Sequence, residues 1–293
     1  MVDVILDTLL DTAKLLPFLF LTYLLMEYLE HRSGDATGRL LGRSGRVGPL
    51  IGGLLGIVPQ CGFSAAAAGL YAGRVVTVGT LLSVWLSTSD EMLPIMISHG
   101  VPVGFLFRFL AVKVFCGVAA GFAVDAVCRL FRRGEEHSHI EDICEREHCH
   151  CEDHFALSAL KHTLKITGFL LVVSFALNTL IYFIGEERIA ALILDRPVLG
   201  NLLAALVGLI PNCASSVVLT ELYLSDVISV GAMLSGLLVN AGVGLPVLFR
   251  NNRPVRDSVR VMALLFAIGL LCGLLTDFTP LGAWVGGIKC GIK

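Results

Sequence analysis

Long apolar runs separated by short polar loops extend along most of the chain. The apolar segments cover residues 14–31, 47–73, 76–98, 103–128, 162–184, 198–224, 228–249 and 261–278. A helix needs about 20 residues to cross a hydrocarbon core of about 30 Å, and most of these segments reach or approach that length. The pattern therefore predicts an all-α polytopic membrane protein.

Two of the segments are interrupted near their middle by similar motifs. The motif reads GIVPQCGFS at residues 56–64 and GLIPNCASS at residues 208–216. Proline removes a backbone donor and clashes with the preceding turn, so a helix must stop or kink at Pro59 and at Pro211. About a dozen residues on either side form arms of roughly 18 Å, too short to cross the membrane alone. We therefore expect a Pro/Cys-interrupted, re-entrant helical hairpin at each break.

The two breaks belong to a longer internal repeat. The same offset of 152 residues (211 − 59 = 152) separates four matched pairs, Pro59 and Pro211, Cys61 and Cys213, Tyr71 and Tyr223, and Pro94 and Pro246. Matched proline, cysteine and tyrosine are not explained by apolar composition alone, so a true repeat is favoured. The predicted organisation is a first membrane repeat over residues 1–133, a loop over 134–154 and a second membrane repeat over 155–293.

The basic residues predict how the repeats are oriented. If each broken segment enters and leaves on one side, the arginines between 32 and 46, at 74, at 129–133 and at 250–260 all lie in the cytoplasm. The first half then begins outside and the second inside, which gives repeats of inverted topology, as in many secondary transporters. The expected location is the inner (cytoplasmic) membrane, with the central loop in the cytoplasm.

A polar stretch in the first half carries the candidate chemistry. Residues 81–94 read LLSVWLSTSDEMLP, and a continuous helix would place Ser83, Ser87, Asp90 and Pro94 on one face. A charge buried in a membrane costs about 2.5–3.5 kcal/mol on insertion scales, so an intramembrane carboxylate is a functional candidate by default.

Lys113 offers a structural alternative for this charge. If the helices on either side of a turn at 99–102 are antiparallel, residue 113 lies level with about residue 88. Lys113 would then be a counter-ion for Asp90 or Glu91, and the carboxylates could serve either this ion pair or a substrate or proton.

The expected site lies near the midplane, between the two hairpin tips. Its candidate substrate- or ion-binding residues are Gln60, Cys61, Ser64, Ser87, Thr88, Asp90, Glu91, Asn212, Cys213, Ser216 and Asn240. Thiols suit soft metals, whereas carboxylates and carbonyls suit manganese-like ions. Small residues at a tip also permit close packing without any ligand, and both roles stay open for the cysteines.

Residues 134–154 form a segment rich in imidazole, thiol and carboxylate groups. The candidate metal ligands are His137, His139, Cys144, His148, Cys149, His150, Cys151 and His154. The paired spacing of a zinc finger is absent, so a loose loop that captures or senses a transition metal is expected rather than a folded domain. A solvated acidic linker is the alternative.

Composition excludes several classes of function. Hydrophobic residues make up 55% and charged residues 16% of the chain, and the net charge of −2 offers no basic surface for nucleic acid. The nine cysteines are scattered and do not form a disulfide framework. No nucleotide-binding Gly-x-x-x-x-Gly-Lys-Ser/Thr motif is present, so no ATP hydrolysis is expected. We also expect no enzymatic activity and no tightly bound cofactor.

Three of these features together resemble the ten-helix heavy-metal exporter family, whose members are described as manganese transporters or arsenic efflux proteins. They are the doubled PQC and PNC breaks, the STSDEMLP segment at 87–94 and the histidine-rich central loop. The resemblance covers nearly the whole chain and implies efflux of a metal or metalloid ion, either manganese-like or arsenic-type.

The expected function is accordingly a secondary transporter in the lipid bilayer, with protons coupled through Asp90 or Glu91. A homo-oligomer is compatible with this expectation. An alternative is an anion carrier, because helix N-termini after Pro59 and Pro211 favour negative charge. A more remote alternative is an intramembrane hydrolase, which would need paired acids or a Ser/His arrangement at depth.

Labelling of single engineered cysteines from each side of the membrane tests the orientation. Both ends of the chain and residue 99 are expected outside, and residues 35–45, 134–154 and 251–258 inside, because arginine favours the cytoplasm. Reaction of residues 134–154 from the outside would contradict the inverted arrangement.

A peptide of residues 134–154 is expected to bind zinc-like ions, because imidazole and thiolate bind transition metals more tightly than carboxylate alone. Titration calorimetry measures this, with a control peptide in which serine replaces each histidine and cysteine. Deletion of the loop should change metal sensitivity more than the basic transport step. Heat from no transition metal would reduce the loop to a solvated linker.

Overall fold

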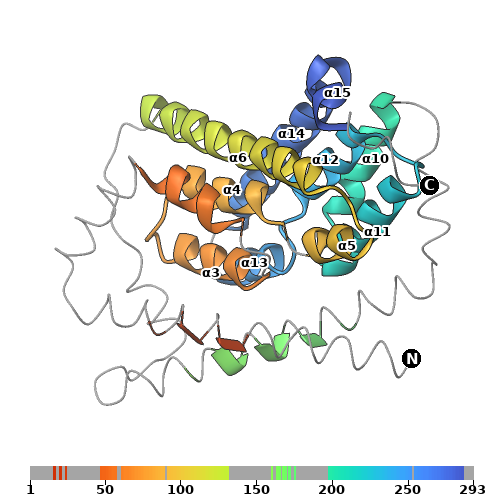
Figure 1. The fold of residues 1–293 in the computed structure, drawn as a ribbon. Coiled ribbons are helices and arrows are strands. Elements are labelled where there is room, and N and C mark those ends of the chain that lie inside the picture. The colour runs from red at the N-terminus through yellow and green to blue at the C-terminus, as the bar shows by residue number, and fades with distance from the viewer. Residues whose placement is uncertain are drawn as a thin grey trace, which may run out of the picture.

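The computed structural model describes residues 47–57, 61–89, 91–131, 197–252 and 254–286, with groups of one to three helical residues between 16 and 24 and between 160 and 175. A helix over 47–55 begins the described first half. The labelled helices are α3 (Cys61–Ala72), α4 (Val78–Ser87), α5 (Met92–Ser98), α6 (Val103–Phe131), α10 (Pro197–Gly208), α11 (Cys213–Leu224), α12 (Val230–Val239), α13 (Gly244–Asn251), α14 (Val255–Phe278) and α15 (Pro280–Gly286) (Figure 1). The described residues include no strand, so the all-α prediction is confirmed for them.

The helix bounds follow the offset found in the sequence. Four pairs of helices begin 152 residues apart: α3 and α11 at 61 and 213, α4 and α12 at 78 and 230, α5 and α13 at 92 and 244, and α6 and α14 at 103 and 255. Arg74 and Asp226, also 152 residues apart, both have a φ of 59°, which is uncommon for residues other than glycine. The repeat therefore extends from matched residues to matched backbone conformation.

The helices are interrupted at both predicted proline breaks. The first helix ends at residue 55, before Pro59, and α3 begins at Cys61. In the second half α10 ends at Gly208 and α11 begins at Cys213, after an extended Asn212 with φ −148° and ψ 150°. The predicted interruptions are thereby confirmed.

Two further interruptions correct the expectation of continuous spans at 76–98 and 228–249. Between α4 and α5 the chain leaves the helix after Ser87, and between α12 and α13 it leaves the helix after Val239. Asn240, at the C-cap of α12, has a non-helical ψ of 95°. Each half therefore contains two broken segments rather than one.

Two hydroxyl groups at the end of α4 donate to carbonyl oxygens one turn earlier. The hydroxyl of Ser87 donates to the carbonyl oxygen of Ser83, and that of Thr88 donates to the carbonyl oxygen of Val84 at 2.7 Å, while Thr88 itself has an extended ψ of 133°. Pro94 lies in the first turn of α5, where its missing N–H costs nothing. The predicted helical face that joined Ser83 and Ser87 to Pro94 is therefore wrong, because a helix end lies between them.

The central helices pack closely on the long helices of their own half. α4 lies against α6, and α12 lies against α14 and α10 (Figure 1). A Cβ at Gly79 would lie 2.2 Å from the carbonyl oxygen of Gly121, and one at Gly231 would lie 2.5 Å from that of Gly273. Glycine at these positions lets the helix backbones touch, as in many membrane helix pairs.

The other helices pack across the two halves. α3 lies beside α13, and α11 lies beside α5 (Figure 1). The helices that follow the proline breaks, α3 and α11, thus each contact a helix of the opposite half, α13 and α5, which follows the break after α12 or α4. This exchange makes the two halves interdependent.

A buried aspartate holds the start of α4. Asp125 of α6 accepts hydrogen bonds from the Thr77 hydroxyl at 2.7 Å through Oδ2 and from the Gly79 amide at 2.9 Å through Oδ1. Thr77 is the N-cap of α4, and its oxygen also accepts from the Thr80 amide at 3.1 Å. The carboxylate therefore satisfies donors at a helix N-terminus, where negative charge is stabilising.

Asp277 of α14 repeats this arrangement at the start of α12. It accepts from the Ser229 hydroxyl at 2.7 Å and from the Gly231 amide at 2.9 Å, and Asn201 Nδ2 adds a third donor at 2.6 Å. Asp125 and Asp277 are 152 residues apart, as are Thr77 and Ser229 and also Gly79 and Gly231, whereas Asn201 has no counterpart because residue 49 is a proline. This pair of aspartates was not among the residues predicted from the sequence.

Among the described residues, three apolar segments are long enough to span a membrane: Val103–Leu130, Val255–Phe278 and Val230–Asn251, the last of which joins α12 and α13 across their break. The protein itself buries 89% of the most apolar window of Val230–Asn251, against 33% and 28% for the other two. α6 accordingly exposes large side chains such as Phe107 and Phe115. Apolar surface of this kind suits lipid, which places α6 and α14 at the periphery and α12 at the centre of a multi-pass membrane protein.

Asp277→Ala is expected to lower the free energy of unfolding by about 1–3 kcal/mol, because the buried Gly231 amide and the buried Asn201 side chain lose their acceptor. Unfolding in detergent measures the change. Glu221→Ala is the control, since the Glu221 side chain is 46% exposed. Equal stability of the two variants would show that the carboxylate does not hold α12.

Candidate functional site

Lys113 lies where the two central helices end. Its side chain is fully buried, and its Nζ donates to the carbonyl oxygen of Thr88, the C-cap of α4, and to that of Leu237, in the last turn of α12, at 3.1 Å. The expectation that Lys113 lies level with residue 88 is therefore confirmed. The matched position in the second half is the buried, apolar Leu265, so this positive charge belongs to one half alone.

The first turn of α3 reaches the same region. Trp85 Nε1, one turn before the end of α4, donates to the carbonyl oxygen of Ser64 at 3.1 Å. A Cβ at Gly244, the first residue of α13, would lie 2.8 Å from that oxygen and 2.8 Å from Trp85 Nε1. Only glycine fits there, which lets the starts of α3 and α13 meet the end of α4.

Ser64 also contributes an unsatisfied group. Its hydroxyl oxygen is buried and has no hydrogen-bond partner within the described part of the chain. An unpaired buried hydroxyl is costly, so it commonly marks a place for a ligand, an ion or water. Ser64 is one of the site residues predicted from the sequence.

The second-half residues of the predicted set occupy two places. Asn212 and Cys213 lie at the start of α11, where the Ser216 hydroxyl donates to the carbonyl oxygen of Cys213 at 2.7 Å. Asn240 lies in the break after α12, and its Oδ1 accepts from the Gly242 amide at 3.0 Å. All four of these side chains are buried. The helix that carries Asn212, Cys213 and Ser216 differs in its packing from the helix that carries Ser64, because α11 contacts α5, whereas α3 contacts α13.

Several predicted residues lie outside the described part. These are Gln60, Asp90, the side chain of Cys61, and the loop ligands His137, His139, Cys144, His148, Cys149, His150, Cys151 and His154. Glu91 is described as the partly buried residue before α5. Within the described residues, no group of three or more His, Cys, Asp and Glu side chains could hold a metal ion.

The helix ends determine the electrostatics of this centre. A helix carries roughly half a negative charge at its C-terminus and half a positive charge at its N-terminus. The carbonyl ends of α4 and α12 meet at Lys113, while the amide ends of α3 and α13 meet beside Trp85. The centre can therefore offer carbonyl oxygens to a cation and backbone amides to an anion, in surroundings shielded from water.

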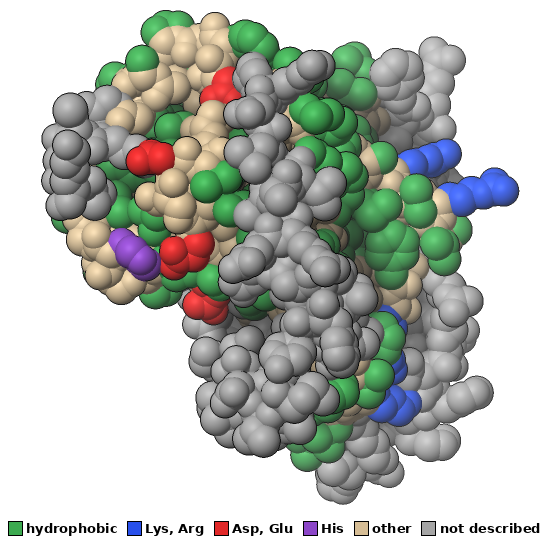
Figure 2. Space-filling model, turned by 90° about the vertical axis from the view of Figure 1, so that its right-hand side faces the viewer, with side chains coloured by type: hydrophobic (Ala, Val, Ile, Leu, Met, Phe, Trp, Pro, Cys, Tyr) green, Lys and Arg blue, Asp and Glu red, His purple; other side chains and the backbone are tan. Residues whose placement is uncertain are grey.

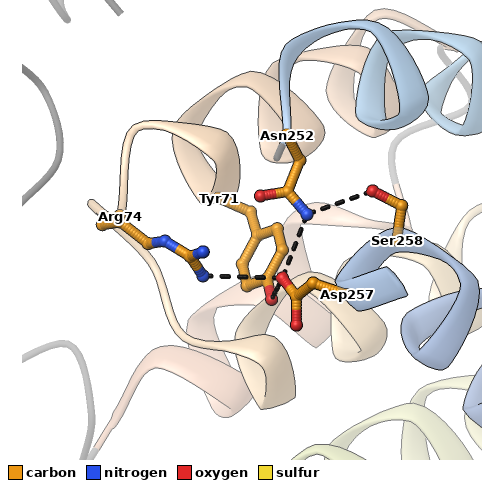
Figure 3. Close-up of polar contacts among 5 residues, drawn as sticks. All are labelled: Tyr71, Arg74, Asn252, Asp257 and Ser258. Carbon is orange, nitrogen blue, oxygen red and sulfur yellow. Dashed lines mark hydrogen bonds and ion pairs between the residues drawn. The ribbon is translucent and has the colours of Figure 1, made fainter. Parts of the chain in front are cut away.

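A polar cluster that the sequence analysis did not identify joins the halves away from this centre. Asp257, in the first turn of α14, accepts from the Tyr71 hydroxyl at 2.7 Å and from Asn252 Nδ2 at 3.0 Å, and Arg74 lies 3.6 Å from the same oxygen (Figure 3). Asn252 also donates to the Ser258 hydroxyl at 3.1 Å. The end of α3 is thereby tied to the start of α14.

The matched positions make a different contact. Tyr223 and Phe105, which correspond to Tyr71 and Asp257, stack with ring centroids 5.5 Å apart. Nearby in the sequence, His99 Nε2 lies 3.8 Å from Glu221 Oε2 at the surface. Figure 2 shows a face on which acidic and histidine side chains gather on the left and lysine and arginine side chains lie at the right margin. Equivalent junctions in the two halves thus differ in chemistry, one polar and one aromatic.

A protein family matches the part of the chain that holds the central loop and the second proline break. Searches of curated proteins and of solved structures found no significant match. Residues 130–250 match the model of the family described as “Putative, 10TM heavy-metal exporter”. Over these residues the comparison confirms the resemblance to the heavy-metal exporter family that the sequence motifs predict.

Proposed function

We propose that this protein is a secondary transporter that exports a metal or metalloid ion, with its site where the ends of α4 and α12 meet the starts of α3 and α13. The observation that carries the proposal is the pair of broken helices at the buried centre of an apolar protein. Interrupted helices in a membrane survive only where protein or a polar cavity satisfies the freed backbone groups. In transporters such breaks form the substrate and ion sites.

The two halves are, in this proposal, inverted-topology repeats with re-entrant hairpins over 47–73 and 198–224. Matched helix starts and crossed packing, α3 on α13 and α11 on α5, support a pseudo-twofold relation between the halves. The basic residues support placing the two halves in opposite orientations. An inverted pair gives alternating access by moving one part of the molecule against the other around a fixed site.

The cargo is proposed to be a manganese-like divalent cation or an arsenic-type metalloid, bound with the help of Cys61, Cys213 and the Asp90 and Glu91 carboxylates. The match of residues 130–250 to the heavy-metal exporter family supports a heavy-metal cargo. The amide ends of α3 and α13, together with the unpaired Ser64 hydroxyl, support a second candidate, an oxyanion. We propose protons as the coupling ion in either case.

The remaining parts are assigned by the same proposal. Residues 134–154 form a cytoplasmic loop at the inner membrane that collects a transition metal, between membrane repeats at 1–133 and 155–293. No tightly bound cofactor and no enzymatic step are required for this function. The proposed site is built within one chain, so the function does not require a homo-oligomer, although it is compatible with one.

Reconstitution into vesicles tests the class of cargo. When a pH gradient is imposed, purified protein should transport one of a panel of Mn²⁺, Zn²⁺, arsenite and phosphate, driven by the flow of protons, and empty vesicles supply the background. Flux of no metal or metalloid, with flux of phosphate instead, would favour the anion carrier.

Substitutions then separate the two cation mechanisms. Asp90→Asn and Glu91→Gln should each reduce gradient-driven flux by about tenfold or more, which corresponds to about 1.4 kcal/mol, if the carboxylates carry protons or a hard cation. Cys61→Ser and Cys213→Ser should do so if the cargo is a soft metal. Glu221→Gln and Cys128→Ser are the matched controls, since Glu221 is exposed and Cys128 lies on α6 away from the breaks. Normal flux in all four site variants would place the site elsewhere.

A further inference from the structure

We propose that the carbonyl ends of α4 and α12 form a monovalent-cation site, and that the ammonium group of Lys113 is its permanently attached occupant. The chain would thus carry its own cation at a place where a free cation could bind. This inference does not depend on the identity of the cargo.

The hydrogen bonds supply the first argument. Nζ of Lys113 donates to carbonyl oxygens from two different helices, Thr88 of α4 and Leu237 of α12, which are 149 residues apart in the chain (237 − 88 = 149). The last carbonyls of a helix have no partner within the helix. In discontinuous membrane helices these exposed carbonyls and C-terminal ends coordinate coupling cations.

Charge decides which kind of cation fits. Two helix C-termini together provide about one negative charge. The group that occupies this place is a monovalent ammonium ion, and a divalent ion would bring one more positive charge into a buried place, which is costly. Neutral carbonyl oxygens also favour a hard ion over a soft one. The site therefore suits Na⁺, K⁺ or a small alkylammonium ion.

Burial shows that the charge is needed. Lys113 is fully buried, and lysine is almost never found so without compensation. The matched residue Leu265 is equally buried and apolar, so packing alone at this position calls for an aliphatic side chain. Lysine in one half only therefore indicates a role for its ammonium group rather than for its stem.

The test removes the attached cation and offers a free one. Lys113→Ala truncates the side chain and leaves space beside the two carbonyl oxygens, and Leu265→Ala makes a similar truncation without removing a charge. Both purified variants and the wild type are unfolded thermally in NaCl, KCl, methylammonium chloride and N-methyl-D-glucamine chloride at equal ionic strength. The last cation is too large to enter the site.

Lys113→Ala should be less stable than the wild type in N-methyl-D-glucamine. It should regain about 3–5 °C in Tm in a small cation present at ten times its Kd. The wild type and Leu265→Ala should show no such difference between salts. Equal Tm values for Lys113→Ala in all four salts, or an equal gain by Leu265→Ala, would overturn the proposal.

A second pair of variants decides the matter if Lys113→Ala cannot be purified in any salt. Lys113→Arg keeps a positive charge, and Lys113→Met fills the space without one. The arginine variant should be recovered in folded form and should unfold at a higher temperature than the methionine variant, because only the former satisfies the two carbonyl oxygens. If the Lys113→Met variant is recovered in folded form and unfolds at the same temperature as Lys113→Arg or at a higher one, no cation is required and the proposal is overturned.

Discussion

The centre of this protein depends on one ammonium group between two helix ends. α4 and α12 both stop near the middle of the structure and direct their unpaired carbonyls to the same place, where lipid could not satisfy them. Lys113 supplies donors to Thr88 and Leu237 and brings a charge that offsets the two helix dipoles.

The surrounding helices hold these two ends in place. Asp125 and Asp277 hold the starts of α4 and α12, while glycine pairs bring α4 against α6 and α12 against α14. Crossed packing of α3 on α13 and of α11 on α5 ties each half to the other. The helix ends at the centre are therefore held in place by contacts from both halves.

The departures from the repeat are where function is expected. Lys113 faces the centre where Leu265 stands in the other half, and Asp257 makes a polar junction where Phe105 makes an aromatic one. The scaffold of capped helices and glycine contacts, by contrast, recurs in both halves. Duplication explains the common backbone, and the unmatched charges give the two halves different chemical tasks.

Local chemistry and pattern made part of this predictable from the sequence. Apolar runs indicate a helical membrane protein, proline forces the breaks before Cys61 and Cys213, and matched residues reveal the offset of 152. The level of Lys113 with residue 88 followed from helix geometry across a short turn. Three features could not be predicted in this way. They are the breaks after Ser87 and Val239, the capping aspartates Asp125 and Asp277, and the meeting of Ser64, Trp85 and Gly244. They depend on hydrogen bonds and close contacts between segments far apart in the chain. A span that looks continuous by hydropathy can end wherever a distant side chain satisfies its free carbonyls, and only the tertiary structure decides which side chain that is.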